Sequence, residues 1–452
     1  MENGSVFTNG DLIRANIGID EGKISVISKS SLNASRKIDC QGKLVLPGII
    51  DAHAHIRDPG YTYKEDFETG SRAAAAGGVT MFCDMPNVEP PTNSLATFIE
   101  KRKIAQSKSL VDFNHFVFPT PSEVSDIARA GAAGFKIFMV RGAYPHDPRI
   151  AVEDHAKLFE MFEAVKKTGL PCLVHPSNMS LFEVFYKKER ESRPDELPWM
   201  SFGKAYTDEL VYGTSVSILV QLAKRTGVRL HLVHTHSAEA ISIIREAKKQ
   251  GYSNISAQVD PKYFITNSHE LEELGPLVLP GGLLPEKRVE VIWDALRTET
   301  IDVLATDHAP HTREEVIETF KKNPWEAPFG CPQLEHYVSV FLNEVNNGRM
   351  TLGQLLRITT SNPAKLINVY PRKGTIQVGS DADFAIVDMK KETVLSSKHV
   401  YTKVGWTPYE GRRVKGIPIK TIRRGEVIME DGEVFGKPGS GEFIPPLSAR
   451  SE

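Results

Sequence analysis

The chain has 452 residues and an almost balanced charge, with 55 Lys and Arg residues against 57 Asp and Glu residues. This balance argues against a general nucleic-acid-binding protein, which would carry a basic excess. No apolar run is long enough to cross a membrane, and the first residues lack the pattern of a secretory signal. The four cysteines are scattered without a CxxC pair, which fits a reducing compartment. We therefore expect a cytoplasmic protein that binds neither nucleic acid nor a membrane.

Both ends of the chain are predicted to form β-strands. Residues 1–46 alternate apolar and polar side chains around a turn at Glu21-Gly22, and residues 374–434 contain similar segments with Gly and Asp turns. Because the termini of a domain often lie close together, we expect one small β-sandwich built from residues 1–48 and 367–452. The last segment, 435–452, is rich in Gly, Pro and Ser and predicts a flexible tail or an arm on a neighbouring subunit.

The middle of the chain, residues 49–366, repeats a short apolar strand followed by an amphipathic helix. Eight parallel-type strands with helices between them predict a (β/α)₈ barrel, also called a TIM barrel. The expected strands are residues 48–55, 79–87, 111–118, 134–139, 171–176, 229–237, 254–260 and 303–311. Between the fifth and sixth strands, residues 182–212 form a long charged insertion that we expect to lie over the barrel mouth.

Polar residues able to bind metals recur at the carboxyl ends of these strands, where TIM barrels carry their active sites. The first strand ends in His53 and His55, which are two residues apart and therefore point the same way. A lone His or Lys at such a place is more often structural, but six convergent residues predict a metal centre, and imidazole and carboxylate suit zinc. His236 shares a strand face with His234, so alternation alone does not separate them. The six residues are His53, His55, Lys136, His175, His234 and Asp307.

The sequence resembles the cyclic amidohydrolases, a family that includes dihydroorotases, allantoinases, hydantoinases and dihydropyrimidinases. The resemblance covers nearly the whole chain, and its motifs are GKLVLPGIIDAHAHIRDPG, GFKIFM, VLATDHAPHT and SNPAKLINVYPRKGTIQVGSDADFAIVD. It implies two Zn²⁺ ions per subunit. His53, His55 and Asp307 would hold one ion, and His175 and His234 the other. Lys136, carboxylated on its side-chain nitrogen, would bridge both. The resemblance also implies a homodimer or a homotetramer.

The chemistry implied by the resemblance is hydrolysis of a ring amide by metal-activated water. Asp307 would be the catalytic residue, taking a proton from the water and passing it to the leaving ring nitrogen. Arg57, Asn87 and His311 match the positions at which dihydroorotases hold the substrate carboxylate, for which Arg is suited by paired hydrogen bonds. The competing interpretation of Arg57 is a loop salt bridge. Its partner would then be Asp58 or Glu65.

We therefore expect a dihydroorotase, which reversibly converts dihydroorotate and water to N-carbamoyl-L-aspartate in pyrimidine biosynthesis. Several segments depart from the dihydroorotase pattern, namely Pro176–Asn178, Pro261–Phe264 and Leu279–Leu284. Arg141 stands where a hydantoinase would carry a Tyr, with Tyr144 nearby, and it either binds an anion or faces solvent. These departures leave open an allantoinase, a hydantoinase or dihydropyrimidinase, or another cyclic imide or ureide hydrolase. A non-catalytic binding subunit is a minor alternative, since all six metal positions are present.

Overall fold

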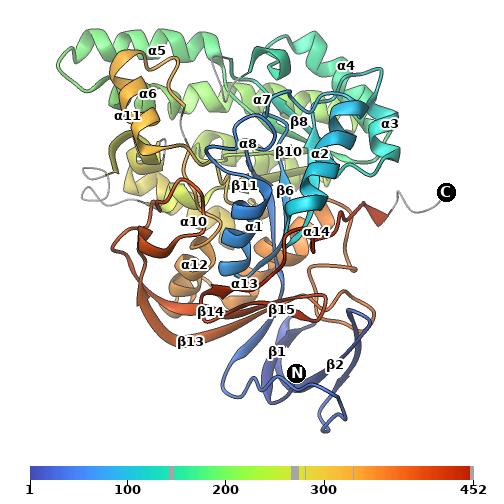
Figure 1. Ribbon diagram of the computed structural model, residues 1–452. Helices are drawn as coiled ribbons and strands as arrows, with labels where there is room; N and C mark the ends of the chain where they lie inside the picture. Colours follow the sequence, from blue (N-terminus) through green and yellow to red (C-terminus); the bar gives the residue numbers. More distant parts are fainter. Residues whose placement is uncertain (142–146, 266–273, 280, 329, 448–452) are drawn as a thin grey trace.

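The computed structural model describes residues 1–141, 147–265, 274–279, 281–328 and 330–447 (Figure 1). Eight strands pair in parallel, each with its neighbours in the chain, and form one sheet. A bridge between Ala54 and His308 and a 2.7 Å hydrogen bond from His55 N to His308 O join its two edges. The predicted TIM barrel is thereby confirmed. Its strands are β5 (Ile49–Ala54), β6 (Val79–Asp84), β7 (Asp112–Val117), β8 (Gly134–Phe138), β9 (Pro171–His175), β10 (Arg229–Leu232), β11 (Ile255–Val259) and β12 (Val303–Leu304).

The barrel strands are short and almost completely buried because helices cover the outer face of the sheet. Several helices begin at capping residues, and Asp66 and Ser94 each close a capping box that satisfies free backbone N–H groups. None of the helices in the described ranges is both long and apolar enough to cross a membrane. The covering helices are α1 (Phe67–Ala76), α2 (Leu95–Lys108), α3 (Val124–Arg129), α4 (His155–Lys166), α7 (Glu209–Thr226), α8 (Ala238–Lys249), α10 (Glu286–Arg297), α12 (Tyr337–Asn346), α13 (Leu352–Leu356) and α14 (Asn362–Leu366).

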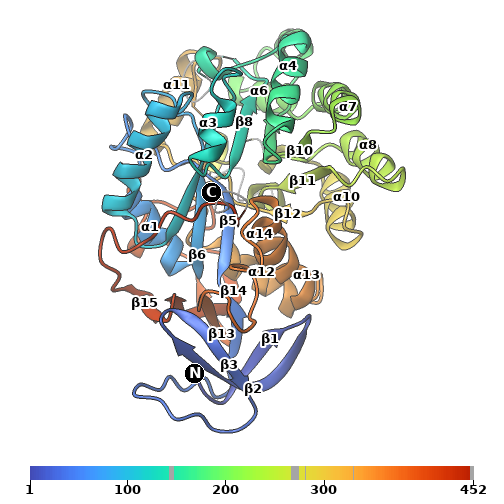
Figure 2. The ribbon, with the colours of Figure 1, turned by 90° about the vertical axis from the view of Figure 1, so that its right-hand side faces the viewer.

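The predicted insertion contains helical structure at the end of the barrel away from the chain-end strands (Figures 1 and 2). Helices α5 (Met179–Ser192) and α6 (Pro198–Tyr206) pack beside α11 (Arg313–Lys322). Aromatic rings join the three helices, with ring centroids 4.9 to 5.7 Å apart in the pairs that link Phe182, Phe202, Phe320 and Trp325. These rings supply a large apolar contact area, which holds the insertion against the barrel.

The two chain ends build a second sheet below the barrel, in the order β16-β15-β14-β13-β4-β1-β2-β3 (Figure 2). Strand β4 pairs in parallel with β1 and antiparallel with β13, so the first and last parts of the chain share one sheet with its own apolar core, as predicted. The residue limits given above for the three parts of the chain stay a prediction. The strands are β1 (Gly4–Thr8), β2 (Asp11–Asp20), β3 (Lys23–Ser28), β4 (Leu44–Pro47), β13 (Phe384–Val394), β14 (Arg413–Arg423), β15 (Glu426–Glu430) and β16 (Glu433–Val434).

The described part of the C-terminal tail, up to residue 447, packs on its own barrel, so the prediction of a flexible tail or an arm is wrong for this part. Phe443 forms a parallel bridge with Phe113, and the amide of Asn114 donates to Ile444 O at 2.7 Å. Gly441 allows the close approach, because a Cβ there would lie 2.0 Å from Val111 O. Ile444 is fully buried, and its burial favours the docked tail.

Candidate metal centre

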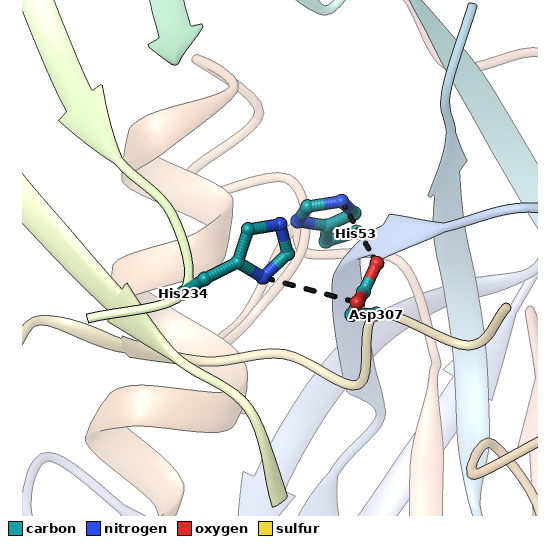
Figure 3. A group of neighbouring side chains, drawn as sticks. All are labelled: His53, His234 and Asp307. Carbon is teal, nitrogen blue, oxygen red and sulfur yellow. Dashed lines mark ion pairs between the residues drawn. The ribbon is translucent and has the colours of Figure 1, made fainter. Parts of the chain in front are cut away.

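The metal-capable residues predicted from the sequence meet at the carboxyl ends of the barrel strands. Figure 3 shows His53, His234 and Asp307 pointing toward one another, with one ligand atom from each within 4.8 Å of the others. His234 and Asp307 follow β10 and β12 and adopt positive φ angles of 59° and 47°. Such angles are strained for residues other than glycine and are concentrated at functional sites. The backbone therefore turns at both positions to present these side chains.

The carboxylate of Asp307 connects the first pair of histidines. Its Oδ1 lies 3.0 Å from His55 Nε2 and 3.3 Å from His53 Nε2. Burial lowers the pKa of His53 well below its usual value and that of His55 to about 4, so both imidazoles are neutral near pH 7. Neutral imidazole is the form that binds metal ions. One carboxylate oxygen and two imidazole nitrogens thus surround a common point.

The remaining histidines extend this group to one side. The ring of His234 lies 5.1 Å from that of His53 and 4.4 Å from that of His175, measured between centroids. Four imidazoles from β5, β9 and the end of β10 therefore form a continuous cluster. This arrangement offers nitrogen ligands for two neighbouring metal ions.

Lys136 lies on β8 and is completely buried. Its Nζ has no hydrogen-bond partner among the described residues and stands 4.9 Å from the centre of the Phe138 ring. Burial lowers the pKa of this amine to about 7. A buried, unpaired ammonium is costly, whereas a neutral amine, or a carboxylated one with metal partners, fits this environment. The residues present therefore fit the predicted two-metal group.

The ring nitrogens of the histidines have hydrogen-bond partners that the sequence did not reveal. Asp260 Oδ2 lies 2.6 Å from His234 Nδ1, and Gln258 Nε2 lies 3.0 Å from His53 Nδ1. The hydroxyl of Tyr206, from α6 of the insertion, lies 2.5 Å from His175 Nε2. Such partners fix the ring orientation of metal-binding histidines and tune their affinity. The period of two along β11 could have pointed to Gln258 and Asp260, but no local signal pointed to Tyr206.

Lys262 also enters the centre, from the 3₁₀ turn η2 (Pro261–Phe264). Its Nζ lies 2.5 Å from Asp307 Oδ2 and 3.4 Å from Asp260 Oδ2. Burial alone would raise the pKa of Asp307, but the nearby Lys262 ammonium outweighs this effect and holds the pKa well below its usual range. Asp307 is therefore ionised, as a metal ligand or a general base must be.

The three predicted substrate residues lie beside the first pair of histidines and are buried. Asn87 Oδ1 lies 2.6 Å from His55 Nδ1, and Arg57 Nη2 lies 3.0 Å from His311 Nε2. The two carboxylates considered for a salt bridge with Arg57 have other partners. Asp58 pairs with Lys108 at 2.7 Å, and Glu65 accepts a hydrogen bond from the hydroxyl of Thr402.

Other residues singled out in the sequence stand apart from the centre. Arg141 is half exposed and pairs with Glu153 and Glu183, which agrees with the solvent-facing alternative. His236 lies against the Tyr212 and Tyr263 rings, while its Nδ1 is 2.7 Å from His234 O. Tyr144 lies outside the described residues.

Comparison with known proteins agrees with this geometry. The Amidohydrolase family matches residues 44–428. A dihydroorotase of Methanosphaera stadtmanae is 35% identical over 427 residues, which cover 93% of this chain and 94% of that protein. An L-hydantoinase of Paenarthrobacter aurescens is 32% identical over 98% of this chain and 97% of its own. The solved L-hydantoinase of Arthrobacter aurescens superimposes with a TM-score of 0.91 at 31% identity, covering 98% of both chains.

The fold and the site thus define a hydrolase that acts on cyclic amides. The chain belongs to the amidohydrolase family.

Proposed function

We propose that this enzyme is a zinc-dependent dihydroorotase, which opens the ring of dihydroorotate to give N-carbamoyl-L-aspartate. The observation that carries the proposal is the buried contact of 3.0 Å between Arg57 and His311 beside the metal centre. A guanidinium presents paired N–H donors to a carboxylate, and the N–H that Arg57 donates to His311 Nε2 orients this guanidinium beside the centre. Dihydroorotate carries a carboxylate next to the ring amide, whereas simple hydantoins and dihydropyrimidines lack it.

The predicted ligand sets remain the proposed assignment. His53, His55 and Asp307 would hold one zinc ion, His175 and His234 the other, and carboxylated Lys136 both. When bound, the ions polarise the amide carbonyl and lower the pKa of water. The imidazoles of His53 and His55 are already neutral, and buried partners hold the rings of His53 and His234, so the centre needs little rearrangement to bind metal.

The residues around the metal centre then have separate roles in the reaction. Asp307 takes a proton from the attacking water and returns one to the leaving ring nitrogen. Arg57 and His311 hold the substrate carboxylate, and this contact fixes the ring relative to Asp307. Asn87 stays a proposed contact of the same carboxylate through its side-chain N–H groups, while its Oδ1, 2.6 Å from His55 Nδ1, keeps the His55 ring in place.

The test is a substrate panel with purified, zinc-loaded protein. We expect dihydroorotate and carbamoyl-aspartate to be interconverted faster than dihydrouracil, hydantoin or allantoin is hydrolysed. Turnover of hydantoin or allantoin without any turnover of dihydroorotate or carbamoyl-aspartate would reject the proposal.

A hydantoinase is the second candidate. It is favoured by the match to the solved L-hydantoinase over 98% of both chains and by the departures at Pro261–Phe264 and Leu279–Leu284. The same panel separates the two functions, because a hydantoinase does not need a carboxylate on its substrate.

Association of the chain into a homodimer or homotetramer stays a prediction.

Carboxylation of Lys136 should depend on pH in a defined direction. Only the neutral amine adds carbon dioxide, and burial lowers the pKa of Lys136 to about 7. Below that pKa the neutral fraction falls about tenfold per pH unit. We therefore expect metal-free protein to recover activity more slowly as the pH falls below about 7, at constant dissolved carbon dioxide and excess zinc. Reactivation kinetics measure this effect, and a rate that does not change between about pH 6 and pH 8 would contradict it.

Tyr206 should tune the zinc affinity through His175. The variant Tyr206→Phe removes the hydroxyl that lies 2.5 Å from His175 Nε2. Loss of such a partner typically costs about tenfold or more in metal affinity. We expect weaker zinc binding by about this factor, with kcat nearly restored at saturating zinc. Tyr186→Phe is the matched control, because the Tyr186 ring packs against Phe202 and Trp325 in the aromatic contacts of the same insertion. Equal zinc affinity in Tyr206→Phe and wild type would refute this role.

A further inference from the structure

Lys262 places a buried positive charge against the central carboxylate of the site. Its side chain is only 4% exposed, and Nζ lies 2.5 Å from Asp307 Oδ2. The two oxygens of Asp307 therefore face different partners. Oδ1 faces the pair His53 and His55, at 3.3 and 3.0 Å, and Oδ2 faces the ammonium. One carboxylate is shared between the predicted metal position and a lysine.

The local backbone holds Lys262 in this position. Strand β11 leads through Asp260 into the turn η2, and the N–H of Ile265 donates to Lys262 O at 3.3 Å. The turn η4 (Gly281–Leu283) packs directly on the same carbonyl, since a Cβ at Gly281 would lie 2.0 Å from Lys262 O. A glycine is needed for this approach. The ammonium is thus directed toward Asp307 by a fixed turn.

The charges at this point need compensation when no metal is bound. Asp307 and Asp260 are both buried, and a buried carboxylate without a partner is strongly destabilising. Lys262 provides the partner for both, at 2.5 and 3.4 Å. The two carboxylates in turn raise the pKa of Lys262 although burial opposes this, so the side chain carries its charge.

A second carboxylate cluster in the chain shows the same arrangement. At the other end of the barrel, Lys373 Nζ lies 2.5 to 3.1 Å from Asp112, Asp381 and Asp383. Those carboxylates also lie close enough together to hold a metal ion. A lysine there compensates a buried cluster of acidic groups. Lys262 does so next to histidines that are able to bind zinc.

From these contacts we propose that Lys262 is an internal counter-ion that stabilises the metal-free centre and weakens zinc binding. The inference rests on the proposed function, because it requires a zinc ion at His53, His55 and Asp307. The ammonium and the metal ion would draw on the negative charge of one carboxylate and repel each other at short range in a medium of low dielectric constant. The site would then be stable without metal and would bind zinc less tightly than its ligand set alone allows.

The test is the variant Lys262→Gln, which keeps a hydrogen-bond donor and removes the charge. We expect its zinc affinity, measured by competition with a chromophoric chelator, to rise by about tenfold or more. Without metal, its melting temperature should fall by at least about 2 to 4 °C, because Asp307 and Asp260 lose their counter-ion. These two changes have opposite signs, and a general loss of packing would not produce both.

Two further variants control the experiment. Lys262→Arg keeps the charge and should resemble wild type in both measurements. Lys373→Gln removes the other buried lysine and should lower the melting temperature without changing the zinc affinity of the histidine-rich centre.

The outcomes separate this inference from the proposed function. A wild-type protein that binds no zinc would overturn the metal centre and the inference with it. If wild type binds zinc but Lys262→Gln binds it no more tightly, or if Lys262→Arg binds it as tightly as the Gln variant, the inference alone is overturned.

Discussion

Asp307→Asn should lower kcat by about 10³ or more while the fold is retained. The change keeps the shape of the side chain but removes the charge that faces His53 and His55 and the group that moves the proton. General acid–base catalysis contributes about 10² to 10⁴ to a rate, and loss of a metal ligand adds to this effect. Steady-state kinetics at saturating zinc, with circular dichroism as the check on folding, measure the result.

His53→Ala should also abolish turnover, because it removes a proposed metal ligand. The same kinetics and the same check on folding apply.

A matched control lies at the opposite end of the same strand. Asp302 precedes β12 and pairs with Lys248 at 2.7 Å, whereas Asp307 follows β12 at the metal centre. Asp302→Asn should therefore lower stability but leave kcat within a few-fold of wild type. If Asp307→Asn kept a kcat like that of Asp302→Asn, Asp307 would be neither the ligand nor the base.

Arg57→Met should raise KM for dihydroorotate roughly 10- to 100-fold with a smaller change in kcat. A hydrogen bond to a charged group contributes about 1.5 to 3 kcal/mol, which corresponds to this range. Met keeps much of the side-chain volume of Arg and removes the donors. Initial rates over a range of dihydroorotate concentrations measure KM.

The effect of Arg57→Met should depend on the substrate. A ring without a carboxylate, such as dihydrouracil, should lose little, because no group of that substrate uses the guanidinium. Arg72→Met is a suitable control, since Arg72 pairs with Glu68 on the surface of α1. Unchanged KM for dihydroorotate in Arg57→Met would show that the carboxylate is held elsewhere.

The sequence predicts the barrel and the histidine positions because both depend on short periodic patterns. A spacing of two residues places His53 and His55 on the same side of a strand, and the repeated strand–helix pattern places the strand ends together. The structure brings His175, His234 and Asp307 to the same place. Both patterns are local in the sequence and do not depend on contacts between distant residues.

The partners of the ligands depend on such contacts, and the sequence did not reveal them. Tyr206 and His175 are separated by 31 residues, and the tyrosine belongs to an insertion with no periodic pattern that aims it at the centre. Lys262 lies in a 3₁₀ turn, where strand alternation no longer predicts the direction of a side chain. For the tail, the content of Gly, Pro and Ser indicated mobility. In the structure the burial of Ile444 favours a tail that is docked on the barrel.

The most direct test of the account is the ratio of kcat/KM for dihydroorotate to that for dihydrouracil, measured with the zinc-loaded wild-type enzyme. The two rings differ by one carboxylate, so the ratio isolates the contribution of the group that Arg57 and His311 are proposed to hold. If Arg57 and His311 hold the carboxylate, this ratio should be about 100 or more in favour of dihydroorotate. A ratio near or below one, with ready hydrolysis of dihydrouracil, would contradict this assignment.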